Sequence, residues 1–296
     1  MNVFMTGASG WIGSAVVPEL LTAGHSVRGL ARSERSAAAL RAAGVEPVAG
    51  DLDQLDVLRT AAEAADAVIH LANKHDWSDL AATNRAERAA VQTFCDALEG
   101  SGKPFLLASG TAIPVGRTLT ELDANPASGP EAPRGGTEAL AIEYATRGVR
   151  SVALRFAPSV HGAGGDHGFL ALLVQAARDH GAAGYVGDGS NRWTAVNRLD
   201  AAGMVALALE KATPGSAAHA AAEVLTTRQI AEAIGATLGV PTVPVAPEAV
   251  AEHFGWLGPI FAMDLPASAD LTRERLGWVP THPTLAEDLA AGAYTS

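Results

Sequence analysis

Residues 5–14 read MTGASGWIGS and place three glycines, Gly7, Gly10 and Gly13, at every third position. The stretch follows an apolar run of strand length and leads into residues 11–25, where apolar side chains recur at helical spacing. Glycines between a buried strand and a helix permit a tight turn, a close approach of a phosphate to the backbone, and close packing of the helix. We therefore expect a dinucleotide here, with its pyrophosphate at the helix N-terminus. A purely structural turn is the alternative.

Strands and helices alternate through the first half of the chain. Apolar runs of strand length separate amphipathic segments of helix length, and most of these runs are continuous, as burial on both faces requires. The expected strands are residues 2–7, 26–32, 45–51, 66–72, 103–109 and 149–156, and the expected helices are residues 11–25, 33–44, 55–65, 82–102 and 137–148. The alternation predicts an α/β fold with a doubly wound parallel sheet of the Rossmann type.

The pattern changes from residue 158 onward. Helices are expected at residues 169–181, 199–212 and 227–239, and a short strand at residues 242–246. We therefore expect residues 1–157 to form a dinucleotide-binding domain. Residues 158–296 are expected to form mostly a smaller substrate-binding lobe, interleaved with the Rossmann core.

Composition limits the class of protein. The 296 residues carry a formal net charge of −11 without a run of Lys and Arg, which disfavours a nucleic-acid partner. The single cysteine, Cys95, excludes an internal disulfide and is typical of a reducing compartment. No apolar run reaches the roughly 18 residues of a membrane helix, and no leader pattern opens the sequence. We therefore expect a cytoplasmic protein with no membrane partner.

The opening motif resembles that of a known group of proteins. Residues 6–14, TGASGWIGS, are similar to the T-G-x-x-G-x-x-G motif of the short-chain dehydrogenase/reductase superfamily, in its extended or atypical branch of epimerase- and dehydratase-like proteins. The segments GDLDQLDVL, VIHLAN, LLASG and LRFAPSVHG match later motifs in the right order, so the resemblance covers essentially the whole chain. It implies a Rossmann fold, a nicotinamide dinucleotide and oxidoreductase-type chemistry.

The resemblance also indicates which residues surround the cofactor. It implies that the segment after the third strand meets the adenine, that the end of the fourth strand lies beside the cofactor, and that the backbone near residues 158–160 approaches the nicotinamide. With the end of the second strand included, the expected cofactor-binding residues are Gly7, Ser9, Gly10, Trp11, Ile12, Gly13, Arg32, Ser33, Asp51, Leu52, Leu71, Ala72, Asn73, Lys74, Pro158, Ser159 and Val160.

The end of the second strand bears on the choice of nicotinamide. A site that prefers NAD usually places Asp or Glu there, to accept a hydrogen bond from the ribose 2′-hydroxyl. Arg32 and Ser33 occupy the position here, and they offer a forked cation and a hydroxyl donor to a 2′-phosphate. We therefore expect NADP(H) to be preferred over NAD(H). The alternative is a solvated Arg32 and a site that is indifferent.

One departure from the superfamily concerns the chemistry. The resemblance implies a Tyr-x-x-x-Lys pair on the helix before the sixth strand, but the matching positions hold Arg134 and Glu138. The usual proton transfer through that tyrosine therefore does not carry over. The matched serine is Ser109, and Lys74 and Arg134 are the other candidate catalytic residues. A solvated loop or a surface ion pair is the alternative for these two.

Candidate substrate contacts are expected around the same crevice. They are His75, Thr111, His161, His167 and Trp193, and Trp193 is expected to wall an apolar ligand. A structural role is the alternative. No metal is expected, because glycines separate His161 from His167 and no carboxylate cluster accompanies them.

The predicted function is that of an NADP(H)-dependent oxidoreductase. It would act on the carbonyl or alcohol of a small, partly apolar molecule, with a proton donor other than the usual tyrosine. The alternatives are an NADP(H)-binding sensor with little catalysis and an epimerase or dehydratase of a sugar derivative. A homodimer is a further expectation, because dimers are common in the superfamily that the chain resembles.

Overall fold

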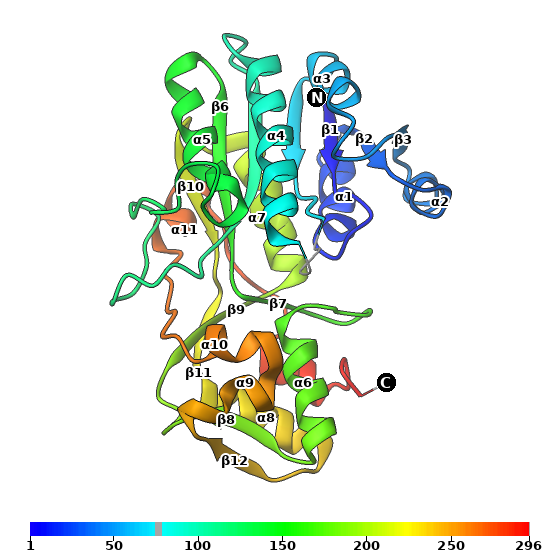
Figure 1. The fold of residues 1–296 in the computed structure, drawn as a ribbon. Coiled ribbons are helices and arrows are strands. Elements are labelled where there is room, and N and C mark those ends of the chain that lie inside the picture. The colour runs from blue at the N-terminus through cyan, green and yellow to red at the C-terminus, as the bar shows by residue number, and fades with distance from the viewer. Residues whose placement is uncertain (75–78, 296) are drawn as a thin grey trace.

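The computed structural model describes residues 1–74 and 79–295, and it divides the chain into two lobes (Figure 1). The upper lobe is built on one large sheet, and the lower lobe contains short strands and helices. His75, a predicted substrate contact, lies outside the described residues. Within the described ranges, a helix with the length and hydropathy needed to span a bilayer is not found.

Seven parallel strands form the large sheet. In spatial order they are β10 (Ser216–Ala220), β6 (Arg150–Phe156), β5 (Pro104–Gly110), β4 (Ala67–His70), β1 (Asn2–Thr6), β2 (Ser26–Ala31) and β3 (Glu46–Ala49). Every residue of β4 is buried, as expected for a central strand of a parallel sheet. The predicted doubly wound Rossmann fold is confirmed.

Helices cover both faces of this sheet. One face packs against α1 (Gly13–Thr22), α2 (Glu34–Ala42) and α7 (Arg198–Lys211). The other face packs against α3 (Leu55–Glu63), α4 (Leu80–Leu98) and α5 (Thr137–Glu143), with the 3-10 turns η1 (Pro133–Gly136) and η2 (Tyr144–Arg147) flanking α5. Cys95 is buried on the inner side of α4, where its thiol is part of the core.

The lower lobe has its own apolar core. Two small sheets contain β7 (Ser159–His161), β9 (Arg192–Asn197) and β11 (Glu223–Thr226), and β8 (Ala183–Val186) and β12 (Thr242–Val245). Its helices are α6 (Phe169–His180), α8 (Thr227–Leu238), α9 (Val250–Phe254), α10 (Gly258–Phe261) and α12 (Leu285–Ala290), with 3-10 turns η3 (Pro247–Ala249) and η4 (Gly255–Leu257). Trp193 and Phe261 are fully buried in this core, with ring centroids 5.2 Å apart.

The second half of the chain also completes the upper lobe. The expected helices from residues 169, 199 and 227 appear as α6, α7 and α8. However, α7 packs on the large sheet, β10 forms its outer strand beside β6, and α11 (Asp270–Leu276) packs against the same core. The lobes are therefore interleaved, and the chain crosses between them more than once.

The strand order fixes where a ligand can bind. The sheet grows from β1 toward β2 and β3 in one direction and toward β4, β5 and β6 in the other, so connections leave β1 and β4 on opposite faces. A crevice forms at the carboxyl ends of strands at such a switch point. In Figure 1 these ends face the lower lobe.

Candidate active site

The glycine loop after β1 is shaped by backbone contacts. Gly7 has φ +72°, and a Cβ on it would lie 2.7 Å from the Ala72 nitrogen. A Cβ on Gly13 would lie 2.0 Å from the Gly7 carbonyl oxygen, so only glycine lets α1 begin this close to the loop. A Cβ on Gly10 would meet one neighbouring atom within 4 Å and would otherwise extend into open space. No side chain of the described residues caps α1, and the Ser14 and Ala15 amides donate to the Gly10 and Ile12 carbonyl oxygens at 2.9 and 3.0 Å.

Trp11 joins the glycine loop to the lower lobe. Its indole Nε1 donates to the Val160 carbonyl oxygen at 2.7 Å, and the Arg198 guanidinium lies 4.1 Å from its ring centroid. These contacts hold the backbone after β6, including Pro158, beside the loop. Residues 158–160 therefore lie next to the glycine loop, their predicted approach to the nicotinamide stays a prediction, and the indole itself connects two protein segments.

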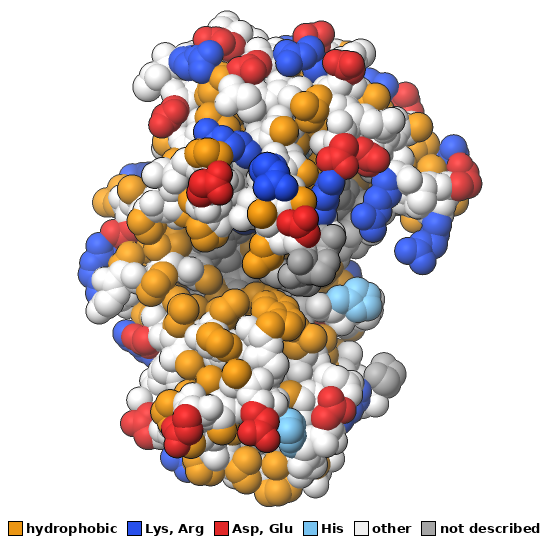
Figure 2. Space-filling model, viewed as in Figure 1, with side chains coloured by type: hydrophobic (Ala, Val, Ile, Leu, Met, Phe, Trp, Pro, Cys, Tyr) orange, Lys and Arg blue, Asp and Glu red, His pale blue; other side chains and the backbone are white. Residues whose placement is uncertain are grey.

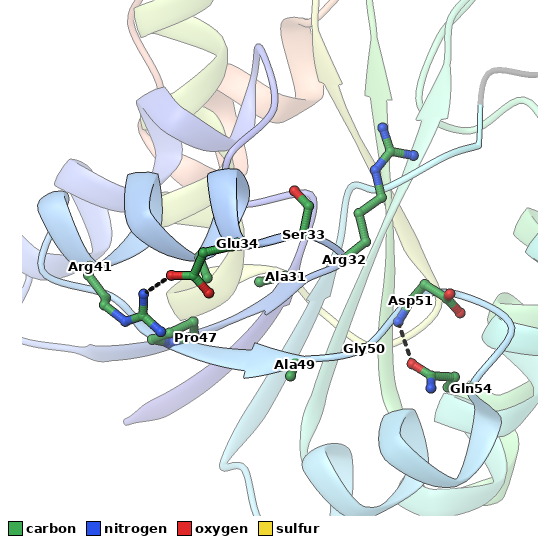
Figure 3. A pocket seen from close by; sticks show the side chains of 11 residues that line it. Ala31, Arg32, Ser33, Glu34, Arg41, Pro47, Ala49, Gly50, Asp51 and Gln54 are labelled. Carbon is green, nitrogen blue, oxygen red and sulfur yellow. Dashed lines mark hydrogen bonds and ion pairs between the residues drawn. The ribbon is translucent and has the colours of Figure 1, made fainter.

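A cavity of about 310 Å³ opens after β2 and β3, lined by Arg32, Ser33 and Asp51 among others (Figure 3). Arg41 on its wall is paired with Glu34 at 2.7 Å, whereas the Arg32 side chain extends away from that pair. Within the described part of the chain, the guanidinium of Arg32 has no hydrogen bond or ion pair. It is an exposed cation where a cofactor ribose would lie in this fold.

Ser33 has a structural duty at the same cavity. Its hydroxyl accepts from the Ser36 backbone nitrogen at 3.2 Å, and the Ser36 hydroxyl reaches back to form a capping box at the start of α2. Asp51 similarly accepts from the Asp53 backbone nitrogen at 2.9 Å. Leu52 is buried in the core below. The side chains of Ser33 and Asp51 thus order their own loops.

Lys74 reaches toward this end of the crevice. Its Nζ donates to both carboxylate oxygens of Asp53, at 2.7 and 2.6 Å, and so joins the loops after β3 and β4. The structure therefore associates Lys74 with the loop that the sequence assigns to the adenine. Leu71, Ala72 and Asn73 line the end of β4, where the Ala72 amide donates to the Thr6 hydroxyl at 3.2 Å.

Ser109 lies at the end of β5 and is paired with a buried acid. Its hydroxyl donates to Glu138 Oε2, which also accepts from Asn125 at 3.1 Å. The other oxygen of Glu138 accepts two hydrogen bonds from Arg155, at 3.0 and 2.5 Å. Burial alone would raise the pKa of Glu138, but the Arg155 charge and these hydrogen bonds lower it. The hydroxyl hydrogen of Ser109 is therefore used in the hydrogen bond to Glu138. The hydroxyl oxygen can still accept a hydrogen bond from a group in the crevice.

Arg155 is itself fully engaged. Its Nη1 lies 3.3 Å from His219 Nε2, and its Nη2 also donates to the Asp123 carbonyl oxygen at 2.8 Å. His219 Nδ1 lies 2.7 Å from the Ser268 carbonyl, so Nδ1 carries the hydrogen and Nε2 accepts from Arg155. Burial lowers the pKa of His219, which is consistent with this neutral form. Glu138 therefore has a fixed counter-charge.

Arg134 occupies the position of the superfamily tyrosine. It is the second residue of η1, directly before α5, and its φ of +53° is the one positive value that the described chain shows outside glycine. Its Nη2 donates to Glu87 Oε1 at 2.6 Å, and its backbone nitrogen donates to Asn84 Oδ1 at 2.9 Å. Its side chain is 37% exposed, whereas that of Glu87 is 1% exposed. Segment 134–138 thus crosses the ends of β4 and β5.

The predicted substrate contacts divide into two groups. Trp193 and His161 are fully buried: Trp193 donates to the Ser159 hydroxyl at 2.9 Å, and His161 lies 2.6 Å from Asp288. Both side chains belong to the core of the lower lobe, and neither is exposed to contact a ligand as the sequence predicted. Thr111 is also buried and lies two residues from Ser109, and its hydroxyl has no hydrogen-bond partner among the described residues. His167 is exposed on a glycine-rich loop.

Comparison with known proteins identifies the family. The model of the NAD dependent epimerase/dehydratase family matches residues 3–221, which include the glycine loop, Ser109 and most of the large sheet. The chain belongs to this epimerase/dehydratase family. Membership places it in the extended branch of the short-chain dehydrogenase/reductase superfamily, as the sequence predicted, and makes it an NAD(P)-dependent enzyme.

Relatives of this family member extend over the whole chain. An uncharacterized protein of Schizosaccharomyces pombe is 43% identical over 297 residues, covering 99% of this chain and 100% of that protein. One of Saccharomyces cerevisiae is 39% identical, covering 98% of each. A 4-hydroxy-2-methyl-3-oxo-4-farnesyl-3,4-dihydroquinoline-1-oxide ketoreductase of Stigmatella aurantiaca is 28% identical, covering 60% of this chain and 55% of that protein.

Solved structures agree on the fold. A double mutant of DesIV, the dTDP-glucose 4,6-dehydratase of Streptomyces venezuelae, with NAD and DAU bound, superposes with a TM-score of 0.76 at 21% identity. The match covers 99% of this chain and 96% of that one. The residues of the present family member also fit a dinucleotide: Gly10 leaves space where a side chain would intrude, and no described side chain caps the N-terminus of α1.

Two important acids of the site were not predicted as site residues. Glu138 was recognised only as a mismatch to lysine, and Glu87 was not singled out. Glu87 continues backward, at helical spacing, the buried face of α4 that Val91, Phe94 and Cys95 form. A glutamate on an otherwise apolar helix face was therefore the available signal.

Proposed function

We propose that this epimerase/dehydratase-family protein is an NADP(H)-dependent oxidoreductase that interconverts the carbonyl and alcohol forms of a small, partly apolar molecule. The observation that carries the proposal is the pairing of Ser109 and Arg134 with separate buried acids at the ends of β5 and β4. Binding a dinucleotide requires neither arrangement, whereas a reacting oxygen needs groups of this kind.

The preference for NADP(H) is supported by the cavity after β2. Arg32 is exposed there, and in the described residues its guanidinium makes no ion pair. Glu34, an acid that lines the same cavity, is paired with Arg41 at 2.7 Å. The 2′-phosphate of NADP(H) would accept charge-assisted hydrogen bonds from Arg32. The 2′-hydroxyl of NAD(H) is bound more favourably by a carboxylate, which accepts its hydrogen, than by a guanidinium.

The two groups at the reacting oxygen have different capacities. The nicotinamide, when bound, supplies or takes the hydride. Because Ser109 already donates to Glu138, its lone pairs accept a hydrogen bond from the alcohol form of the substrate. Arg134 only donates, so it stabilises negative charge on the carbonyl oxygen. Arginine does not release its proton in this pH range, and we assign the transferred proton to solvent water.

The lower lobe favours a partly apolar substrate. The surface is hollowed between the lobes, and apolar side chains gather on the lower lobe beside the hollow (Figure 2). Large side chains stay exposed in this lobe, with Trp256 at 46% and Met263 at 41%. The Stigmatella aurantiaca relative is a ketoreductase by name, which agrees with this chemistry.

A nucleotide-sugar substrate is less well supported. Arg192, a basic residue of the lower lobe, donates to Asp264 through Nε and Nη2 at 3.0 and 2.6 Å. A diphosphate would have to compete with that carboxylate. A sensor remains the second candidate, because Arg134 and Glu138 replace the superfamily's Tyr and Lys.

The proposal is tested by turnover. Purified protein is mixed with NADPH and a panel of aryl and alkyl aldehydes and ketones, and loss of the reduced-nicotinamide absorbance is followed. We expect turnover of apolar members, reduced roughly 10-fold or more in Ser109→Ala and in Arg134→Ala. Ser190→Ala, at an exposed serine far along the chain, is the matched control. Tight NADPH binding without turnover across the panel would contradict the proposed oxidoreductase activity and favour the sensor.

A further inference from the structure

Glu87 is an acid in a position that packing alone would give to an apolar residue. It lies on the buried face of α4, above Ala90, Val91 and Phe94, with a side chain 1% exposed. Burying a carboxylate is costly unless cations and hydrogen-bond donors surround it. The residues around Glu87 therefore indicate what the acid is for.

Three side chains meet this carboxylate. Arg134 Nη2 donates to Oε1 at 2.6 Å, and Asn73 Nδ2 donates to Oε2 at 3.2 Å. His70 Nε2 lies 3.7 Å from Oε1, and the opposite ring nitrogen of His70 lies 2.7 Å from the Thr6 hydroxyl. Burial alone would raise the pKa of Glu87, but the Arg134 charge and the nearby His70 lower it to about 2. Glu87 is thus an anion anchored to the ends of β1 and β4.

The backbone at Arg134 is held in a conformation that non-glycine residues rarely adopt. Its φ of +53° costs free energy and persists only where surrounding contacts impose it. Two such contacts come from α4: Asn84 accepts from the Arg134 nitrogen at 2.9 Å, and Arg88 donates to the Gly135 carbonyl at 2.6 Å. One face of α4 therefore fixes both the backbone and the guanidinium of Arg134.

The guanidinium is not used up by these contacts. Glu87 takes Nη2, while Nε is buried without a hydrogen-bond partner in the described residues. Part of the side chain is exposed, at 37%, so the group combines a fixed end with an accessible one. A guanidinium anchored in this way is suited to meet an oxygen that carries negative charge.

We infer that Glu87 is the positioning residue that orients the Arg134 guanidinium toward the reacting oxygen of the substrate. The inference rests on the proposed function, and it assigns to α4 a role that dinucleotide binding does not require. Glu87 touches neither substrate nor cofactor in this account. It acts through Arg134, so its effect must disappear when Arg134 is absent.

A double-mutant cycle tests this dependence. We expect Glu87→Gln and Arg134→Ala each to lower kcat roughly 10- to 100-fold. The double variant is expected to be no slower than Arg134→Ala alone, because the two residues act as one unit. Losses that multiply in the double variant would show that Glu87 acts independently of Arg134 and would overturn the inference.

Two controls separate positioning from general damage. Glu99→Gln removes the acid of a surface Arg–Glu pair, Arg147 Nη2 to Glu99 Oε2 at 2.6 Å, and is expected to leave kcat unchanged. The NADPH affinity of each variant, measured by tryptophan fluorescence, is expected to stay within about twofold of the wild type, because an uncoupled arginine should leave the glycine loop intact. An affinity that falls in parallel with kcat in Glu87→Gln would mean collapse of the site and would also overturn the inference.

A readout on the free protein keeps the inference testable without turnover. In the ¹H–¹⁵N spectrum, the Arg134 Nε–H signal is assigned by its disappearance in Arg134→Ala. We expect the Nε–H hydrogen of Arg134 to exchange slowly with water in the wild type. In Glu87→Gln we expect its signal to broaden, or its chemical shift to move toward the values of exposed arginines. An unchanged signal in Glu87→Gln would contradict the inference. If no carbonyl compound turns over, the proposed function fails and this spectrum alone decides the role of Glu87.

Discussion

At the residue scale, Ser109 and Arg134 differ in what they can offer an oxygen atom. The hydroxyl of Ser109 points its hydrogen at Glu138, and Glu138 is held in turn by Arg155. In the proposed reaction, a carbonyl oxygen would accept a hydrogen bond from Arg134, and the hydroxyl of an alcohol would donate one to Ser109. The Tyr and Lys of the superfamily are replaced by an Arg and a Glu, each with a separate partner of opposite charge.

The Glu87 carboxylate gives stability a specific dependence on pH. Its pKa is near 4.5 in the unfolded chain and about 2 in the folded protein, so the folded state binds its proton less readily. The stability that it contributes is present above about pH 4.5 and is lost as the pH falls toward about 2. We expect the free energy of unfolding, measured in urea, to fall less steeply over this range in Glu87→Gln. An identical slope would show that the carboxylate is not stabilised in the fold.

Gly13 is expected to tolerate no side chain. Because a Cβ there would lie 2.0 Å from the Gly7 carbonyl oxygen, Gly13→Ala must displace the loop or the start of α1. We expect NADPH affinity to fall roughly 10-fold or more and stability to fall by about 1–3 kcal/mol. Gly203→Ala is the control, because Gly203 lies inside α7 with no atom within 4 Å of its Cβ position. Equal NADPH affinity in Gly13→Ala and the wild type would show that the glycine loop does not bind the nucleotide.

Residues with a local signature could be predicted, and those defined by distant partners could not. The roles of Gly7 and Gly13 follow from their order after a strand, and the structure gives them the close contacts that this order implies. The burial of Trp193 and His161 depends on the small sheets of the lower lobe, which the sequence did not reveal. The pairing of Glu87 with Arg134 joins residues 47 positions apart and leaves no local pattern.

At the scale of elements, α2 shows how one residue can serve both structure and a ligand. Ser33 caps the helix and also lines the cavity beside Arg32. The sequence predicted its place near the cofactor. The Ser33 hydroxyl already accepts a hydrogen bond from the Ser36 amide, so a bound ligand would contact a hydroxyl that also caps the helix.

Removal of this cap should be visible in stability. We expect Ser33→Ala to lower the free energy of unfolding by about 1 kcal/mol, because the Ser36 amide loses its acceptor. Ser33→Gly is the matched comparison and should cost only a few tenths of a kcal/mol. The measurement is urea unfolding in the absence of nucleotide. If both variants were as stable as the wild type, the capping box would not form in solution.

Elements with strong periodicity were predicted well, and short strands were not. The alternation through β6 and the long helices α6, α7 and α8 follow from apolar runs and helical spacing. By contrast, β10 reads SAAHA, which has neither alternation nor a run of large apolar residues. It forms because β6 offers an open edge and α7 packs beside it, and both are tertiary facts.

At the scale of the whole molecule, the two lobes are parts of one folding unit. The large sheet needs β10 and α7 from the second half of the chain, and the core that includes α1 also includes α7. The predicted boundary at residue 157 therefore separates two segments of the sequence, but these segments are not two independently folded domains. The contact between Trp11 and Val160 further links the glycine loop to the lower lobe.

A fragment of residues 1–157 is therefore expected to fail as an independent domain. It would expose the apolar face of the sheet that α7 covers and the edge of β6 that β10 pairs with. We expect it to show no cooperative thermal transition by circular dichroism and no NADPH binding, whereas the full chain shows both. A fragment that melts cooperatively and binds the nucleotide would show that the lobes fold separately.

The central claim is that the carboxyl end of the sheet binds NADP(H) with its 2′-phosphate on Arg32. The most direct test is a fluorescence titration of the wild type and Arg32→Ala with NADPH and with NADH. We expect the wild type to bind NADPH more tightly than NADH, and Arg32→Ala to lose roughly 10-fold or more in NADPH affinity with little change for NADH. Equal affinities for the two nucleotides in the wild type, or equal losses in the variant, would contradict it.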